Sequence, residues 1–312
     1  MDQAKITPMI KQYLTIKEEY PDAILFYRMG DFYEMFFDDS KTASKVLEIT
    51  LTSRNKNDYS PVPMCGVPFR AARGYIARLI ENGYKVAICD QTEDPALARG
   101  LVKREVIRVI TPGMIIEDEF LDEKTNNFIL ALFSLNNSFG ISYVDISTGT
   151  FRLAQSSDVA AVSDEILRIS PKEILIPASA ADNGLYAEII NGFPEKAISY
   201  INDEVFEFNK SRERLIGQFN TFSLEGFGCE NLKSGISAAG ALIYYISENQ
   251  KQRLSHLTGL DTYYLDNFLW IDETSCRNLE LMKNLQTGSR HATLLSVLDK
   301  TITSMGSRLF KE

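Results

Sequence analysis

The sequence has few residues of the kinds that build metal centres, disulfide frameworks and membrane spans. Its only two histidines, His256 and His291, lie in the last quarter of 312 residues, and its four cysteines form no CxxC pair. This spacing excludes the usual zinc motifs and indicates reduced thiols. No apolar run reaches the roughly 18–20 residues of a membrane span, and the N-terminus lacks a signal-peptide apolar region. We therefore expect a cytoplasmic protein without a bound metal.

Motifs for phosphate chemistry and nucleophilic catalysis are also missing. The sequence contains no GxxxxGK[ST] phosphate loop, which nucleotide hydrolases use to hold phosphate groups. Neither histidine stands in a nucleophile motif, which argues against a serine or cysteine hydrolase. We expect no enzyme activity and no cofactor in this chain.

The charge that is present is distributed unevenly. Lysine and arginine number 33 against 42 aspartate and glutamate, a net charge of −9, which argues against a protein that coats nucleic acid over its whole surface. Residues 1–115 carry 16 basic and 15 acidic residues, whereas residues 116–312 carry 17 and 27. Segment 51–110 is the most basic, with 10 against 6. Contact with a polyanion is therefore expected in the first third.

Local patterns predict a compact α/β domain in that first third. An apolar strand at 23–29 is interrupted by a Gly-Asp turn, and residues 32–37 continue in extended form. Residues 61–68 contain three prolines and a glycine, so we do not expect a regular central strand there. The other predicted elements are helices at 4–20, 40–49 and 69–83 and strands at 84–91 and 104–111.

The rest of the chain predicts two further parts. After an acidic, turn-rich linker at 116–127, three strand-like runs predict an antiparallel meander. Alternating helices and strands follow, ending in a long helix near 230–250. This order is typical of an RNase H-like architecture, which we expect over 128–255. Residues 256–312 predict the start of a helical domain, which we expect to continue beyond residue 312 because the last helix has no stop signal.

The segment DFYEMFF carries the most distinctive pattern of side chains. In extended chain Phe32, Glu34 and Phe36 share one face, and Phe32 and Glu34 would lie ~6–7 Å apart. That face presents an aromatic plate beside a carboxylate. By itself the same pattern also fits a buried strand in which Phe32 belongs to the core and Glu34 is a solvated edge residue.

Longer motifs carry a resemblance to a known family. FYRMGDFYEMFFDDSKTAS, PVPMCGVP and GYKVAICDQTEDPALARGLVKREVIRVITPG closely resemble the mismatch-binding domain of the MutS family of DNA mismatch repair proteins, and FLWIDETSCRNLEL and SVLDKTITSMGSRL resemble the start of its core domain. The middle fits the family's connector domain in size and strand order. The resemblance implies a mismatch-recognition domain at 1–115, a linker at 116–127, an RNase H-like connector at 128–255 and the start of a helical core at 256–312.

The resemblance also implies a mechanism. Phe32 would enter the minor groove at a mispaired or unpaired base, and Glu34 would form a hydrogen bond with that base. Wedging is cheapest where pairing is already weak, so deformability would provide the discrimination. Burial and the phosphate field would raise the pKa of Glu34. Other residues that the resemblance places at the DNA are Met29, Arg54, Met64, Cys65, Arg70 and Arg108.

Partners and alternatives complete these expectations. The resemblance implies mismatched double-stranded DNA as ligand, MutL as a partner of the connector, and a second MutS subunit in the full-length protein, where an ATPase would use ATP and Mg²⁺. One alternative is a metal-dependent nuclease or phosphotransferase on the middle domain. Its carboxylates would be Asp145, in YVDISTGTF, and Glu173, although two-metal catalysis needs several that converge. A second alternative is a protein-docking module without a nucleic-acid role.

Overall fold

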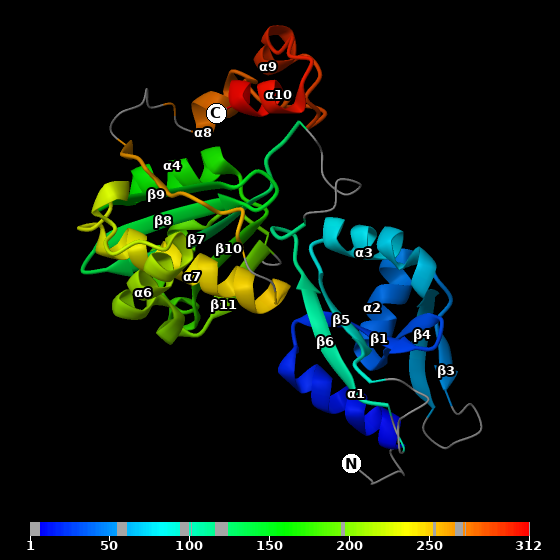
Figure 1. Ribbon diagram of the computed structural model, residues 1–312. Helices are drawn as coiled ribbons and strands as arrows, with labels where there is room; N and C mark the ends of the chain where they lie inside the picture. Colours follow the sequence, from blue (N-terminus) through cyan, green and yellow to red (C-terminus); the bar gives the residue numbers. More distant parts are fainter. Residues whose placement is uncertain are drawn as a thin grey trace. The chain divides into compact units, whose positions relative to one another are not determined.

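The computed structural model describes residues 7–54, 61–93, 100, 102–115, 124–194, 197–251, 254–265, 271 and 273–311. The chain divides into two compact units, one formed by Met1–Pro112 with Ser247–Gln252 and the other by Gly113–Ile246 with Arg253–Glu312 (Figure 1). Within the described ranges, no helix is long and apolar enough to cross a membrane.

The first unit is built on a six-stranded mixed sheet. Its strands are β1 (Ala23–Met29), β2 (Phe32–Phe36), β3 (Thr52–Arg54), β4 (Val62–Pro68), β5 (Lys85–Gln91) and β6 (Arg104–Ile110). Their order is β3-β4-β2-β1-β5-β6. Only the β1–β5 pair is parallel; its neighbours are antiparallel. The α/β prediction for this part of the chain is confirmed.

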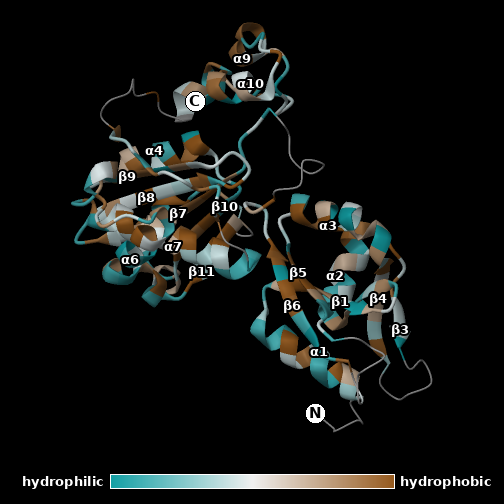
Figure 2. Cartoon of the chain, viewed as in Figure 1, coloured by the Kyte–Doolittle hydropathy of each residue, from teal (hydrophilic) through white to brown (hydrophobic). Residues whose placement is uncertain are grey.

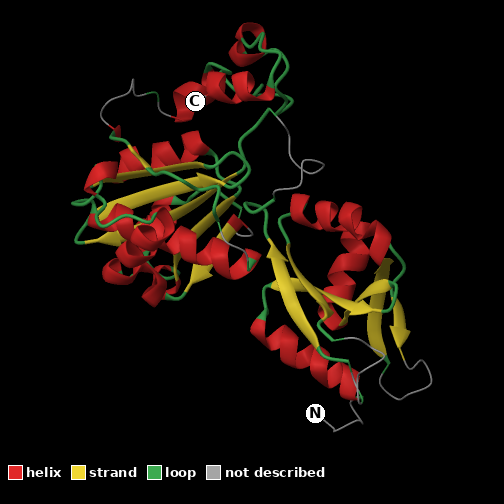
Figure 3. Ribbon diagram, viewed as in Figure 1, coloured by secondary structure: helices red, strands yellow, loops and turns green. Residues whose placement is uncertain are grey.

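Helices cover both faces of this sheet (Figure 3). Helix α1 (Pro8–Glu19) packs Met9, Ile10, Tyr13 and Ile16 into one core with the sheet. Helices α2 (Phe37–Leu47) and α3 (Ala72–Glu81) cover the other face. Phe37, expected in extended chain, begins α2 with a φ of 54°. The helix predictions are confirmed with shifted ends.

Strand β4 corrects one prediction. Residues 62–68 form a strand that pairs with β2 on one side and β3 on the other, so the proline-rich segment lies inside the sheet. The prolines are tolerated because of where they fall. Pro63 pairs only with the three-residue β3, and Pro68 is the last residue of β4. The pairing with β2 runs from Met64 to Pro68, and within it proline occurs only at that last position.

The second unit has a sheet with RNase H-like order. Strands β7 (Phe128–Leu135), β8 (Ser138–Asp145), β9 (Thr150–Ser156), β10 (Glu173–Pro177), β11 (Ile198–Ile201) and β12 (Asp261–Thr262) stand in the order β11-β10-β7-β8-β9-β12. β7, β8 and β9 form the antiparallel meander, while β10 and β11 add parallel to β7. This confirms the RNase H-like architecture.

Helices pack on both faces of the second sheet as well. They are α4 (Val159–Ile169), α5 (Gly184–Ile189), α6 (Phe208–Phe219) and α7 (Lys233–Gln250), and the C-terminal part adds α8 (Glu273–Asn278), α9 (Leu294–Leu298) and α10 (Ser304–Lys311). Figure 2 shows apolar residues concentrated on the central strands and α7. α7 approaches β8 closely at Gly140, where an added Cβ would lie 2.1 Å from the backbone carbon of Ser234.

The packing of the second unit moves two of the expected limits. Met114 is buried in the same core as β7 and β8, so the chain joins the second unit from Gly113. β12 pairs with β9, and Leu257, Leu260 and Leu265 are buried in the two cores of this sheet. The expected boundary between residues 255 and 256 therefore falls inside the packed unit. Most of the expected linker, residues 116–123, lies outside the described residues.

Candidate nucleic-acid interface

The β1–β2 hairpin brings three of the predicted site residues together. Gly30 turns the chain with a φ of +58°, a conformation that glycine adopts without steric cost. The register then pairs Met29 with Phe32 and Tyr27 with Glu34. Paired residues of neighbouring strands point to the same face, so Met29, Phe32 and Glu34 share the face that α1 partly covers.

Phe32 and Phe36 lie on that shared face but differ in their exposure to solvent. Phe36 is fully buried, with its ring 5.0 Å from that of Tyr13 on α1. Phe32 lies four residues before Phe36, next to the hairpin turn, and is 47% exposed. The alternative in which Phe32 belongs to the core is therefore wrong. The face is hydrophobic core at one end and open at the other.

Glu34 lies between these two aromatic residues and is partly buried. Its Oε2 is 3.3 Å from Nη1 of Arg54 on β3. Burial raises the pKa of the Glu34 carboxyl above its ordinary value, while the charge of Arg54 acts in the opposite direction. The raised pKa agrees in direction with the expectation from the sequence. Opposite Glu34 on β4 stands Gly66, whose lack of a side chain leaves this part of the face uncovered.

Strand register divides the remaining predicted residues between the two faces. Met64 pairs with Phe36 and Thr52, and Arg54 pairs with Val62 two residues away. Because residues two apart on a strand share a face, Met64 and Arg54 lie on the Phe32 face. The structure thus brings together five of the eight predicted residues, from three segments of the chain.

Cys65 requires a correction. It follows Met64 directly and so points to the opposite face, where it is fully buried and its Sγ donates to the backbone oxygen of Ser40 on α2. Burial raises the pKa of its thiol to about 12. Its side chain cannot contribute to a surface around Phe32. The alternation of side chains along a strand predicts this orientation only if residues 62–68 form a strand, which the prolines of this segment argue against.

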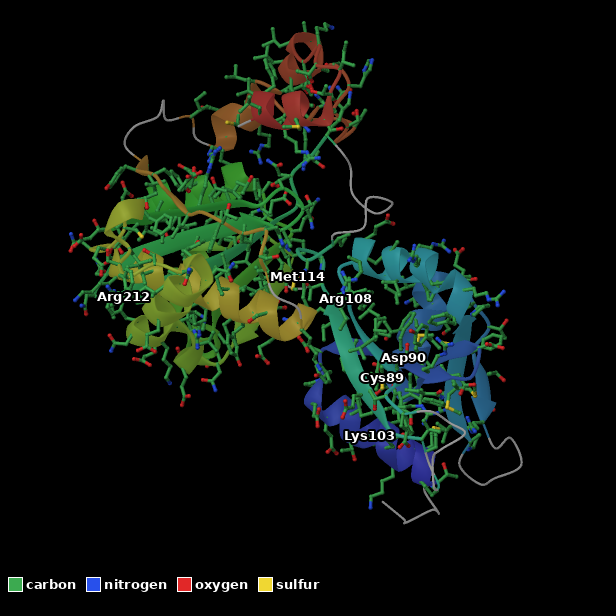
Figure 4. The ribbon with its side chains drawn as sticks, viewed as in Figure 1. Cys89, Asp90, Lys103, Arg108, Met114 and Arg212 are labelled. Atoms are coloured by element: carbon green, nitrogen blue, oxygen red, sulfur yellow. The ribbon has the colours of Figure 1, made fainter. Side chains whose placement is uncertain are left out.

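Arg108 and Arg70 also lie apart from the Phe32 face. Arg108 pairs with Ile88, whose partner on β1 is Phe26, and this row of residues belongs to the face under α2 and α3. Figure 4 shows Arg108 and Lys103 toward opposite ends of β6. Arg70 is exposed in the short turn after β4. It follows Phe69, whose backbone N–H donates to the oxygen of Asp31 in the hairpin turn at 2.8 Å.

Residues that the sequence did not single out surround the hairpin turn. The Arg28 guanidinium stacks 3.4 Å from the ring centroid of Phe69, and Phe69 lies 5.6 Å from Tyr33. Arg104, which is almost fully buried, contacts the end of β1 from the other side. No local motif marks these residues, because the contacts join positions tens of residues apart in the sequence.

The two carboxylates of the nuclease alternative are occupied and separated. Asp145 accepts hydrogen bonds from the N–H groups of Asn127 and Ser147 and from the Ser147 hydroxyl. Glu173 accepts from Ser199 and Tyr245. Asp145 on β8 pairs with Phe128 of β7, and Glu173 on β10 pairs with the following residue of β7, Ile129. Successive strand residues face opposite sides, so these carboxylates lie on opposite faces of the sheet.

Comparisons with known proteins match both units. MutS domain I matches residues 7–119 and MutS domain II matches residues 127–258. The DNA mismatch repair protein MutS of Desulfosudis oleivorans is 56% identical over 305 residues, covering 98% of this chain and 35% of that protein. Those of Desulforapulum autotrophicum and Symbiobacterium thermophilum are 54% and 47% identical, covering 100% of this chain and 35% and 36% of the relatives.

The chain thus spans about a third of the length of these curated relatives. The two domain matches together cover more than half of the chain and follow one another without overlap. They fall on the sheet with the exposed hairpin and on the RNase H-like sheet, respectively. The chain therefore belongs to the MutS family and carries its domains I and II.

Proposed function

We propose that this chain recognises mispaired or unpaired bases in double-stranded DNA in the service of mismatch repair. Phe32 inserts into the minor groove at the defect, and Glu34 forms a hydrogen bond with the displaced base. The observation that supports this most is the half-exposed ring of Phe32 at the open end of a sheet face, beside a carboxylate on the same strand face.

The chemistry of that surface suits a defect better than a sequence. An aromatic wedge between base steps costs a few kcal/mol of stacking and bends the duplex. A mispaired base has already lost part of its stacking and pairing, so the cost is lowest there. The cross-strand partners of Phe32 are Met29 and Pro68, whose apolar side chains carry no hydrogen-bond donors for reading bases. Selectivity then follows from deformability.

Glu34 restricts binding to the right partner. An ionised carboxylate near phosphates is repelled, so it opposes binding to DNA that offers it no hydrogen bond. At a mispair the ionised carboxylate accepts a hydrogen bond from a base N–H, whereas the protonated carboxyl donates a hydrogen bond to a base acceptor. The raised pKa of Glu34 favours the second mode. In the free protein Arg54 partly neutralises it. Arg54 and the exposed Arg70 supply phosphate contacts, which position the protein without reading sequence.

Further proposals follow from family membership. The RNase H-like unit contacts MutL, and a full-length MutS pairs with a second MutS subunit. The ATPase of a full-length MutS uses ATP and Mg²⁺. These 312 residues contain no phosphate loop for it. We accordingly propose a binding role without catalysis for this chain.

The test is a comparison of two duplexes. Affinity is measured by fluorescence anisotropy for a duplex with one unpaired thymine and for its fully paired counterpart, at several salt concentrations. We expect preference for the first duplex and a steep loss of affinity with salt. Phe32→Ala should abolish the preference, whereas Tyr200→Ala, which removes a similarly exposed aromatic ring of the second unit, should retain it. Equal affinity of the wild type for both duplexes would contradict the proposal.

A further inference from the structure

Arg104 has an unusual environment for a charged residue. Its side chain is almost fully buried, and no carboxylate among the described residues forms an ion pair with it. Its guanidinium instead donates to backbone and neutral groups: Nε to the oxygen of Arg28 at 2.8 Å, and Nη1 to the oxygen of Val102 at 3.0 Å and to Oε1 of Gln12 at 3.3 Å. Burying a cation without a carboxylate partner is costly, so the burial of Arg104 needs an explanation.

The contacts of Arg104 converge on the end of β1. Nη2 lies 3.6 Å from Sδ of Met29, and the guanidinium lies 4.9 Å from the ring centroid of Tyr27. The hydroxyl of Tyr27 in turn donates to Gln12 on α1 at 2.5 Å. Arg104 therefore links β6, α1 and the last residues of β1 in one set of hydrogen bonds.

These contacts lie where the register of β1 with β5 ends. The last pair of that register is Tyr27 and Cys89, whereas β1 continues to Met29. There Arg104, which pairs with Gln91 on β5, donates to the backbone oxygen of Arg28. Met29, which it also contacts, is the cross-strand partner of Phe32. The residue that holds Met29 thus fixes the base from which Phe32 projects.

We propose that Arg104 is a positioning residue for mismatch discrimination, which holds the β1–β2 hairpin so that Phe32 stands ready to insert. This proposal rests on the function proposed above. Arg104 does not touch DNA in this role; it acts through Arg28 and Met29. Its planar fork is essential because it serves several acceptors at once, which a lysine ammonium on a flexible stem does not reproduce.

The experiment compares Arg104→Met and Arg104→Lys in the full 312-residue chain. The measured quantity is the ratio of affinities for the duplex with an unpaired thymine and for its paired counterpart. Both variants should reduce this ratio about five- to tenfold, which corresponds to about 1.0–1.4 kcal/mol. Lys103→Met is the matched control, since it removes a charge from the preceding, exposed residue, whose partner is Glu105. It should leave the ratio unchanged.

A double-mutant cycle separates positioning from direct contact. In a Phe32→Ala background, Arg104→Met should have no further effect on the ratio, because the residue acts through Phe32. Full preference in Arg104→Lys, or an equal loss of affinity for both duplexes in Arg104→Met, would overturn the proposal. Thermal unfolding of each variant checks that it folds.

A second measurement keeps this inference distinct from the proposed function. The Met29 methyl resonance, observed by NMR without DNA, should shift and broaden in both Arg104 variants and stay unchanged in Lys103→Met. If the wild type shows no preference between the duplexes, the proposed function fails regardless of Arg104. If the Met29 resonance is unaffected by the Arg104 substitutions, Arg104 does not hold the hairpin and the further inference fails.

Discussion

The two sheets of this chain differ in how far their aromatic and acidic side chains are exposed and in how many hydrogen bonds the acidic side chains form. In the first sheet, one face leaves Phe32 half exposed, and Glu34 on that face forms an ion pair with Arg54. In the second sheet, Asp145 and Glu173 are 1% exposed and are surrounded by hydrogen-bond donors from the chain itself. Buried polar groups satisfied internally stabilise a fold, whereas incompletely satisfied, exposed groups are available to a ligand. This contrast supports our proposal that the first sheet carries the recognition surface and that the second sheet is a scaffold.

The largest expected effect contrasts two aromatic residues on one strand face. Phe36→Ala should destabilise the first unit by about 3–5 kcal/mol, the usual cost of emptying a buried phenylalanine site, since Phe36 is fully buried. Phe32→Ala should change stability little because half of its ring is already in water. Urea unfolding of both variants measures the difference. Equal destabilisation would mean that Phe32 is a core residue and would remove the basis for a recognition surface.

The second prediction tests the close packing of the scaffold. Gly140→Ala would place a Cβ 2.1 Å from the backbone of Ser234 on α7, and overpacking of this kind costs about 1–3 kcal/mol or more. Gly184→Ala is the control, because nothing lies within 4 Å of a Cβ there. Thermal unfolding should show a loss only for the first substitution. Affinity for mismatched DNA, measured well below the unfolding temperature, should be retained in both variants.

The third prediction asks whether Asp145 is structural. The N–H groups of Asn127 and Ser147 donate to different oxygens of Asp145, so in Asp145→Asn the amide NH2 faces one of these donors and about 1–3 kcal/mol of stability should be lost. Asp158→Asn should be nearly neutral, since Asp158 caps α4 and asparagine caps helices equally well. Chemical denaturation measures both. DNA cleavage that depends on a divalent metal and disappears in Asp145→Asn would instead support the nuclease alternative.

The smallest expected effect is a pH dependence at Glu34. Because burial raises the pKa of Glu34, its contribution to stability is present below the ordinary glutamate pKa and is lost as pH rises through the folded-state pKa. The stability of the wild type relative to Glu34→Gln should therefore fall with rising pH in that window. Glu105, whose pKa is lowered by Lys103, provides the opposite case. The stability of the wild type relative to Glu105→Gln should therefore rise with rising pH. Unfolding curves recorded between about pH 3 and 7 measure both trends. Trends of the opposite sign would contradict the prediction.

Much of the fold was predictable because its signals are local. Alternating and continuous apolar runs marked β1, β2, β5 and the meander of the second unit, and turn residues such as Gly30 marked where they end. The common face of Phe32, Glu34 and Phe36 followed from the period of two in strands, whereas Met29 was predicted from the resemblance and the strand register places it on the same face. Such patterns depend only on backbone geometry within a few residues.

Other features required the assembled tertiary structure. The sequence by itself determined which side chains share a face, but only the position of α1 decided that Phe36 is buried and Phe32 is not. The place of the proline-rich β4 inside the sheet, the burial of Cys65, the Glu34–Arg54 pair and the contacts of Arg104 were likewise decided by packing. The physical reason is that these contacts join residues distant in sequence, whose proximity depends on how all the elements fill one core.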